Sequence, residues 1–280
     1  LNLRFLRFLR RKGSVPESVA PMAHPSQGTT TKTATTTEPS RELSTQQTST
    51  PQAQPRPRQK DNSRKSFNQT TNPHPLIRDQ WFGSIQVSAP ISRALHQIGY
   101  VDPTPIQEEA IPAFLEGSDL VGQAMTGTGK TAAFGISLAE LIDPNATSVQ
   151  AIVIVPTREL AVQVTDELRR ISNHRGIRAL AVYGGQSIQQ QIQALNKGIH
   201  IVVGTPGRIM DHQRRGTLRL NRVKFVVLDE ADEMLDIGFA EDIDRILRQT
   251  PSQRQTVLFS ATFPGFIRGL IHRHLRDPVW

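Results

Sequence analysis

Short apolar runs alternate with helical patterns along the chain from Asp119 onward. The apolar runs lie at residues 119–124, 150–155, 178–183, 199–203, 223–228 and 255–260. Most are continuous stretches of Val, Ile and Leu rather than alternations of apolar and polar residues, which is typical of strands buried on both faces. Strands that alternate with helices form βαβ units. The pattern therefore predicts an α/β fold with an open, mostly parallel sheet and helices on both of its faces.

The segments between these runs carry apolar residues at helical spacing. We expect helices at residues 130–142, 158–173, 187–196, 206–214, 239–249 and 264–275, and a short helix at 91–98 before the first strand. Pro156, Pro206 and Pro264 stand just before or at expected helix starts, where the missing N–H costs nothing. No internal repeat is evident, so we expect residues 81–280 to form one globular domain.

Residues 1–80 have a different composition from the rest of the chain. They carry 13 basic and 5 acidic side chains, whereas residues 81–280 carry 20 of each, so the net charge of +8 comes entirely from the first 80 residues. Nine of the 19 prolines also lie there. Such a segment has too little apolar surface to offset the entropy lost on ordering the chain. We therefore expect a basic, disordered extension at residues 1–80.

The composition also excludes several classes of protein. No run of about 20 apolar residues is present, so we expect no membrane span. Cysteine is absent, which excludes disulfide scaffolds, thiolate nucleophiles and zinc sites with cysteine ligands. These features are compatible with a reducing compartment, and we expect a cytoplasmic location.

The strongest chemical signal is the segment AMTGTGKT, which follows an expected strand and opens an expected helix. Gly127 and Gly129 allow backbone N–H groups to approach a phosphate chain at the positive end of that helix. Lys130 supplies a point charge for the β and γ phosphates, and the Thr131 hydroxyl is placed to ligate Mg²⁺. Ala124 stands where the generic pattern has its first glycine. The expected nucleotide-binding residues of this loop are Ala124, Met125, Thr126, Gly127, Thr128, Gly129, Lys130 and Thr131.

Two carboxylates, Asp229 and Glu230, follow the apolar strand at 223–228. Ligands of open α/β sheets bind beyond the carboxyl ends of the strands, so this pair should share one crevice with the phosphate loop. We expect Asp229 to hold Mg²⁺, partly through water. We expect Glu230 to polarise the water that attacks the γ phosphate, which makes Glu230, Lys130 and Asp229 the candidate catalytic residues. An isolated acidic pair would instead be interpreted as a helix N-cap.

Several motifs together resemble those of the DEAD-box RNA helicases. They are DEAD at residues 229–232, AMTGTGKT at 124–131, PTREL at 156–160, TPGR at 205–208 and SAT at 260–262. The similarity runs from about Phe82 to Val279, in the order of the family's motifs. It implies a RecA-like P-loop NTPase domain with ATP and Mg²⁺ as cofactors. It also implies ATP hydrolysis coupled to RNA binding and to local unwinding of short duplexes.

The resemblance gives roles to residues that would mean little alone. The segment YVDPTPIQ at 100–107 is similar to the family's adenine-recognition segment. Gln107, expected in a proline-rich loop, would read the edge of adenine, because an amide presents a donor and an acceptor together. Phe82 would stack on the adenine face. Ser260 and Thr262 would hydrogen-bond to Asp232 and couple the nucleotide site to the RNA face.

RNA contacts are implied for three segments that each follow an expected strand and precede or open a helix. Backbone N–H groups and short hydroxyls can meet phosphates there without reading bases. Either arginine of these segments, taken alone, would be interpreted as a solvated residue at a helix start. The zero net charge of residues 81–280 agrees with a local groove rather than a broad basic face. The expected contact residues are Pro156, Thr157, Arg158, Gly184, Gly185, Thr205, Pro206, Gly207 and Arg208.

Members of the family close two RecA-like domains around ATP and RNA, and arginines of the second domain complete the nucleotide site. The second-domain pattern HRxGRxGR is not found in these 280 residues. An arginine finger contributes about 10³ to 10⁵ in rate in related nucleotide hydrolysis. We therefore expect this chain to be the first half of a longer protein, to bind ATP weakly and to hydrolyse it poorly by itself.

Two other functions stay open at this point. The chain can act as a nucleotide-responsive RNA-binding or partner-binding module without catalysis, with the basic extension supplying most of the affinity. Binding through the extension would weaken steeply with salt and would not depend on ATP. An unrelated P-loop ATPase is disfavoured, because it would not explain Gln107, PTREL and TPGR together.

Two parts of the extension invite hypotheses of their own. Residues 1–12 interleave Leu and Phe with arginines, which we interpret as a frayed basic tail or translated upstream sequence. Contact with an anionic surface and an organellar transit peptide are the alternatives. The basic residues between 56 and 65 can tether RNA nonspecifically, although a soluble linker is the preferred interpretation. These basic residues are Arg56, Arg58, Lys60, Arg64 and Lys65.

Overall fold

The computed structural model describes residues 78–280. The expected extension at residues 1–80 lies almost entirely outside this range. The hypotheses on residues 1–12 and on the basic cluster between 56 and 65 lie outside it as well. None of the helices in the described part is long and apolar enough to cross a bilayer.

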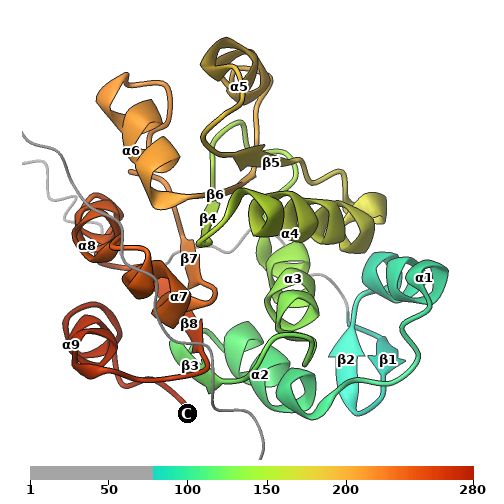
Figure 1. Ribbon diagram of the computed structural model, residues 1–280. Helices are drawn as coiled ribbons and strands as arrows, with labels where there is room; N and C mark the ends of the chain where they lie inside the picture. The colour runs from blue at the N-terminus through green and yellow to red at the C-terminus, as the bar shows by residue number, and fades with distance from the viewer. Residues whose placement is uncertain (1–77) are drawn as a thin grey trace, which may run out of the picture. The chain divides into compact units, whose positions relative to one another are not determined.

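The centre of the domain is a six-stranded parallel sheet (Figure 1). Its strands are β3 (Leu120–Gln123), β4 (Ala151–Ile154), β5 (Ala179–Val182), β6 (Ile201–Gly204), β7 (Phe225–Leu228) and β8 (Gln255–Ser260). They lie in the order β3-β8-β7-β4-β6-β5. Because all six run in one direction, the segments that follow them meet at one edge of the sheet. The expected strands and the parallel sheet are confirmed.

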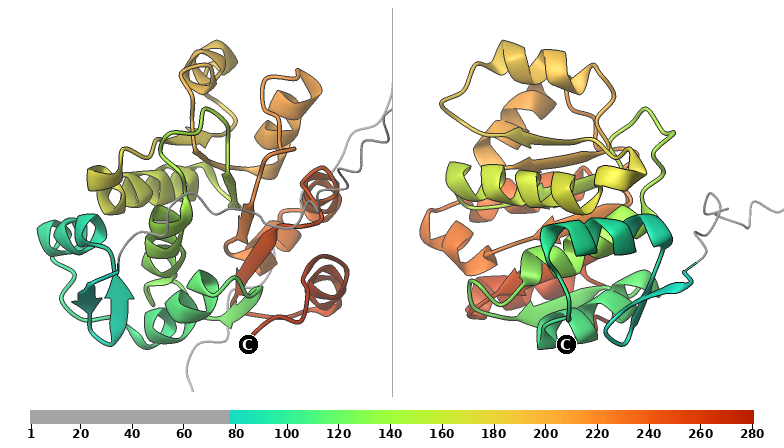
Figure 2. Two further views of the ribbon diagram at one scale, coloured as in Figure 1. Left: turned by 180° about the vertical axis from the view of Figure 1, so that it is seen from behind. Right: turned by 90° about the vertical axis from the view of Figure 1, so that its right-hand side faces the viewer.

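Helices cover both faces of this sheet (Figures 1 and 2). One face carries α1 (Ala89–Ile98), α2 (Pro105–Leu115), α3 (Lys130–Leu141) and α4 (Arg158–Ile171). The other carries α6 (Pro206–Arg214), α7 (Ala231–Asp236), α8 (Ala240–Arg248) and α9 (Gly265–His274). Helix α5 (Ile188–Leu195) lies beside the edge strand β5, and a 3-10 turn (Asn173–Arg175) follows α4.

The central strand β4 shows why its apolar run is continuous. Ala151 and Val153 belong to the core beneath α3 and α4, whereas Ile152 and Ile154 belong to the core beneath α6, α8 and α9. All four side chains are fully buried. Successive residues of a strand point to opposite faces, so a strand covered on both faces has no position for a polar side chain.

Of the elements before β3, the sequence pattern predicted the helix at 91–98, which is α1, but not the two strands before it or the helix after it. Residues 80–87 form an antiparallel hairpin of β1 (Gln80–Phe82) and β2 (Ile85–Val87). Helix α2 occupies the segment expected to be a proline-rich loop. Pro105 stands at its first position, where a helix tolerates proline, and Gln107 Oε1 accepts a hydrogen bond from the backbone N of the N-cap residue Thr104. The short helix α7, directly after Glu230, was also not predicted.

Candidate nucleotide and RNA site

The phosphate loop joins the carboxyl end of β3 to the first residue of α3. Gly127 and Gly129 have φ angles of 81° and 94°, a left-handed backbone that residues with a Cβ atom rarely adopt. This conformation lets the 12-residue helix α3 begin directly at Lys130. The positive end of the helix therefore faces the loop, as anion binding requires.

Lys130 is buried at the centre of this loop. Its Nζ donates a hydrogen bond to the carbonyl oxygen of Ala124 at 2.9 Å. Thr128 Oγ1 donates to the carbonyl oxygen of Met125 at 2.9 Å, which tightens the same turn. An ammonium carries three N–H donors, so two donors of Lys130 are not used by protein groups in the described residues.

Asp229 lies at the end of β7 and is only 2% exposed. Its Oδ1 has no hydrogen-bond partner among the described residues. Burial is the main cause that raises the pKa of Asp229 to about 6. The positive charge of Lys130 opposes this rise, and the negative charge of Glu230 adds to it. A buried carboxylate with an unpartnered oxygen needs a cation to offset its desolvation. This side chain therefore fits an ion such as Mg²⁺.

The surroundings of Asp229 indicate how such an ion would be held. No group of three or more His, Asp or Glu side chains with metal-binding geometry is found in residues 78–280. Mg²⁺ commonly takes one or two protein oxygens and completes its shell with water and substrate phosphates. Asp229 and the Thr131 hydroxyl fit an ion that arrives with the nucleotide rather than one that is permanently bound.

Glu230 has a strained backbone. Its φ and ψ angles are 53° and 54°, in the left-handed region, at the N-cap position of α7. This conformation costs a residue with a side chain about 1–2 kcal/mol. The chain turns sharply here, so that consecutive carboxylates at the end of β7 both line the cavity at the phosphate loop.

Seven of the residues expected to bind and hydrolyse the nucleotide line one cavity of about 410 Å³, whereas Phe82, Gln107, Ala124, Met125 and Thr128 are not among its lining residues. The expected lining residues are Thr126, Gly127, Gly129, Lys130, Thr131, Asp229 and Glu230. Other lining residues come from the segment before α2 and from α3 and α4: Tyr100, Ala132, Leu160, Gln163, Val164 and Glu167. The four expected polar residues, Lys130, Thr131, Asp229 and Glu230, are thus brought together.

Asp232 is joined to the SAT segment by three hydrogen bonds. Thr262 donates to Asp232 Oδ2 from its backbone N at 2.8 Å and from its Oγ1 at 3.0 Å. The backbone N of Asp232 donates to Ser260 Oγ at 3.3 Å. Burial alone would raise the pKa of Asp232, but the hydrogen bonds from Thr262 and Ser260 outweigh it and hold this pKa below its usual value. The expected contacts are present.

The three segments expected to contact RNA lie together. PTREL follows β4, the Gly184–Gly185 loop follows β5 and TPGR follows β6, and these strands are neighbours in the sheet. Arg208 donates from NH1 to the carbonyl oxygen of Gln186 at 3.1 Å. A Cβ atom on Gly185 would lie 3.4 Å from the Arg158 guanidinium. Gly185 itself has a φ angle of 85°, which favours glycine.

Comparison with known proteins assigns the family. The model of the DEAD/DEAH box helicase family matches residues 104–268. The chain belongs to this family. It is 52% identical over 197 residues to the DEAD-box ATP-dependent RNA helicase CshA of Geobacillus kaustophilus, which covers 70% of this chain and 42% of that protein. It is 53% identical to CshA of Bacillus cereus over the same length, covering 38% of that protein.

Solved structures agree with this assignment. A DEAD box protein from the hyperthermophile Methanococcus jannaschii superimposes with a TM-score of 0.68 and 45% identity, covering 70% of this chain and 54% of that one. A hypothetical ATP-dependent RNA helicase from Sulfolobus tokodaii gives a TM-score of 0.64 and 38% identity, covering 68% and 55%. The expected RecA-like fold is confirmed. The chain spans about two fifths of the length of its curated relatives.

Two expectations for the adenine site of this DEAD-box domain are corrected. Phe82 is 3% exposed and packs into the core from β1, which leaves almost no ring surface for a base. Gln107 lies in the first turn of α2 rather than in a loop. Its Oε1 accepts from the backbone N of Thr104 and its Nε2 donates to the carbonyl oxygen of Gly129, both at 3.0 Å. One N–H and one lone pair of this buried amide are left for another partner.

Tyr100 is a site residue that the sequence reasoning missed. Its ring lines the cavity at the phosphate loop, and its hydroxyl donates a short hydrogen bond to Glu167 on α4. Burial and this hydrogen bond raise the pKa of Tyr100 to about 12. The signal that could have identified Tyr100 is its position as the aromatic residue of the segment YVDPTPIQ.

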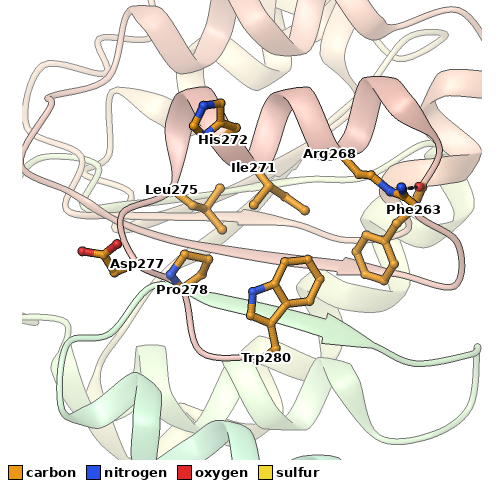
Figure 3. Close-up of a pocket in the computed structure, with 8 residues that line it drawn as sticks. All are labelled: Phe263, Arg268, Ile271, His272, Leu275, Asp277, Pro278 and Trp280. Atoms are coloured by element: carbon orange, nitrogen blue, oxygen red, sulfur yellow. Dashed lines mark hydrogen bonds between the residues drawn. The ribbon is translucent and has the colours of Figure 1, made fainter.

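A second hollow, of about 600 Å³, lies between α9 and the C-terminal segment (Figure 3). Its walls are mainly apolar and include Phe263, Ile271, Leu275, Pro278 and Trp280. It shares no lining residue with the cavity at the phosphate loop. Its apolar walls suit a phosphate chain less well than the cavity that holds Lys130, Asp229 and Glu230.

Proposed function

We propose that this domain is the ATP-binding part of an ATP-dependent RNA helicase, in which ATP hydrolysis is coupled to RNA binding and to local unwinding of duplexes. The observation that carries the proposal is the buried carboxylate of Asp229, whose Oδ1 has no partner in the described residues, in one cavity with Lys130 and Glu230. A cation with a phosphate chain would satisfy both the carboxylate and the free ammonium donors.

The chemistry assigned to the site follows from its side chains. Two N–H groups of Lys130 and the backbone N–H groups of the glycine loop would bind phosphate oxygens. Asp229 and Thr131 would hold Mg²⁺, which neutralises charge on the phosphates. Glu230 would accept a proton from the water that attacks the γ phosphorus, as the bond from that phosphorus to the leaving oxygen breaks.

Adenine recognition is assigned to Tyr100 and Gln107. The ring of Tyr100 lines the cavity and offers an aromatic surface to the base. The free N–H and free lone pair of Gln107 match the donor and acceptor on the adenine edge. Gln107 also holds the carbonyl oxygen of Gly129, so base recognition and the shape of the phosphate loop would be linked.

The PTREL, Gly184–Gly185 and TPGR segments are proposed to bind the phosphates of RNA without reading its bases. The proposed contact residues are the nine that the sequence predicted. Asp232, Ser260 and Thr262 are proposed to couple this surface to the nucleotide site, because their hydrogen bonds connect the carboxyl ends of β7 and β8. A second RecA-like domain is the proposed partner of this domain in the full protein. A cytoplasmic location is proposed for the full protein.

The test uses the 280-residue chain beside Lys130→Ala and Glu230→Gln variants. Binding of a fluorescent ATP analogue with Mg²⁺ should weaken at least about tenfold in Lys130→Ala and stay near wild type in Glu230→Gln. ATP hydrolysis, measured with and without single-stranded RNA, should be slow because the second-domain arginines are outside these residues. Any RNA-stimulated turnover should disappear in Glu230→Gln.

Two results would overturn the proposal. Unchanged nucleotide binding in Lys130→Ala would place the nucleotide elsewhere. RNA binding that does not change with ATP and that falls steeply with salt would favour the non-catalytic binding module, in which the basic extension supplies the affinity.

A further inference from the structure

A buried side chain connects two of the segments that are proposed to bind RNA. Gln191 lies in α5 and is 2% exposed. Its Oε1 accepts a hydrogen bond from Arg208 NH1 at 3.0 Å and lies 2.9 Å from His212 Nε2. Its Nε2 donates to the carbonyl oxygen of Tyr183 at 3.1 Å and to Gln186 Oε1 at 2.8 Å. Gln191 thus contacts both sides of the Gly184–Gly185 loop and the TPGR helix.

The amide of Gln191 is fully satisfied, and its orientation is fixed by its partners. A primary amide offers two lone pairs and two N–H groups, and all four are used here. Arginine can only donate and a carbonyl oxygen can only accept, so Oε1 must face Arg208 and Nε2 must face Tyr183. His212 Nε2 then has to carry the proton that Oε1 accepts.

The state of His212 agrees with this orientation. Its Nδ1 lies 2.9 Å from Thr217 Oγ1, whose hydroxyl donates to the carbonyl oxygen of His212 at 3.1 Å. Burial, and after it the charge of Arg208, lowers the pKa of His212, which favours the neutral ring. All four hydrogen-bonding sites of the Gln191 amide therefore have partners, as a buried polar group requires.

This network holds the guanidinium of Arg208 in one orientation. Its NH1 is shared between the Gln186 carbonyl oxygen at 3.1 Å and Gln191 Oε1 at 3.0 Å. No partner for its Nε or NH2 is found in the described part of the chain. These two donors are free to bind a phosphate, next to the exposed backbone of Gly184 and Gly185.

We propose that Gln191 is a positioning residue for RNA binding. It fixes the Gly184–Gly185 loop and Arg208 relative to each other, so that backbone N–H groups and the guanidinium meet one stretch of phosphate backbone. This inference rests on the proposed RNA-binding function of the two segments. Without Gln191 only the hydrogen bond from Arg208 NH1 to the Gln186 carbonyl oxygen joins the arginine to the loop, so more of their ordering must occur when RNA binds.

The test compares Gln191→Met with Gln190→Met in the 280-residue chain. Methionine keeps the length of the side chain and removes its hydrogen bonds, and Gln190 is an exposed neighbour on the same helix. Binding of a labelled single-stranded RNA is measured at several salt concentrations, together with binding of a fluorescent ATP analogue. Gln191→Met should weaken RNA binding about tenfold and reduce the salt slope by about one. Gln190→Met should bind RNA as wild type does, and both variants should bind the ATP analogue within about twofold of wild type.

An Arg208→Ala background separates positioning from a general loss of structure. If Gln191 acts through Arg208, Gln191→Met should weaken RNA binding much less in that background than in wild type. Equal losses in both backgrounds would overturn the positioning role, as would wild-type RNA affinity in Gln191→Met.

Gln191→Glu replaces Gln191→Met in the test if the methionine variant does not fold. It should also weaken RNA binding, because its carboxylate pairs with Arg208. If neither folds, Gln191 is a stability residue and the inference fails. If wild type itself does not bind RNA, the proposed function fails first.

Discussion

Asp229→Asn removes one negative charge from the buried end of β7 while it keeps the size of the side chain. The pKa of Asp229 is raised from 3.8 to about 6, and burial is the main cause. A raised carboxyl pKa means that the unfolded chain loses this proton at lower pH than the folded chain. The contribution of Asp229 to stability is therefore full below about pH 3.8 and is lost as pH rises towards 6.

The size of this loss follows from linkage. A complete shift from 3.8 to about 6 corresponds to a loss of about 3 kcal/mol on going from acid to neutral pH. Part of this stability has already been lost at pH 5. Between about pH 5 and 7.5 the stability of wild type should fall by about 1.4 kcal/mol relative to Asp229→Asn. For a domain of this size that is a difference of about 3–6 °C in melting temperature.

The assay is urea unfolding of both proteins at the two pH values, without nucleotide or Mg²⁺. At each pH, the free energy of unfolding of the variant is subtracted from that of wild type. The change of this difference between the two pH values is the quantity tested. Any cost of the asparagine N–H groups that does not depend on pH cancels. Glu233→Gln, which removes an exposed carboxylate on α7, is the matched control. A difference that does not change with pH, or one that favours wild type as pH rises, would refute the reasoning.

Mg²⁺ provides the complementary measurement. The ion needs the ionised carboxylate, so protons and Mg²⁺ compete at Asp229. The gain in ATP-analogue affinity on adding Mg²⁺ should therefore shrink in wild type as pH falls below about 6. In Asp229→Asn the gain should be small at every pH. An undiminished effect of Mg²⁺ in this variant would show that Asp229 does not hold the ion.

Three further predictions concern other parts of the site. Tyr100→Phe keeps the ring and should bind the ATP analogue within about twofold of wild type, whereas Tyr100→Ala should bind about tenfold more weakly; equal affinities would exclude the ring as a base platform. Gly185→Ala forces a Cβ atom onto a φ angle of 85° and should weaken RNA binding in an anisotropy titration without changing ATP-analogue binding. Thr262→Val removes one of two hydrogen bonds to Asp232 Oδ2 and should reduce the effect of RNA on nucleotide affinity, measured by titrating each ligand in the presence of the other.

The parallel sheet could be predicted because its strands are buried on both faces. Each position of β4 requires an apolar side chain, so its sequence AIVI has no polar interruption and its pattern has no alternative interpretation. The phosphate loop could be placed because Gly127 and Gly129 act through their backbone, and Lys130 stands directly after them at the start of the helix. Such features depend on neighbours in the sequence, so the sequence alone reveals them.

Helix α2 could not be predicted in this way. Three prolines lie at positions 103, 105 and 112, and each argues locally against a helix. The helix forms because Thr104 and Gln107 cap its first turn and because Ile111 and Phe114 are buried in the core. Burial against distant segments outweighs local propensity here, and no local pattern records it.

The residues that connect the motifs to one another were the hardest to find from the sequence. Gln191 stands in the run QQQ at 189–191 and has the appearance of a solvated helix face, yet all four hydrogen-bonding sites of its amide are used. Gln107 binds the phosphate loop through Gly129, and Thr262 binds Asp232. The bonds from Gln107 to Gly129, from Arg208 to Gln191 and from Thr262 to Asp232 join residues 22, 17 and 30 positions apart. Motif residues are recognised one segment at a time, but the position of one segment relative to the next depends on contacts that only the folded chain defines. A variant of such a connecting residue should therefore disturb two motifs at once, whereas a variant of a phosphate-contacting residue should disturb one.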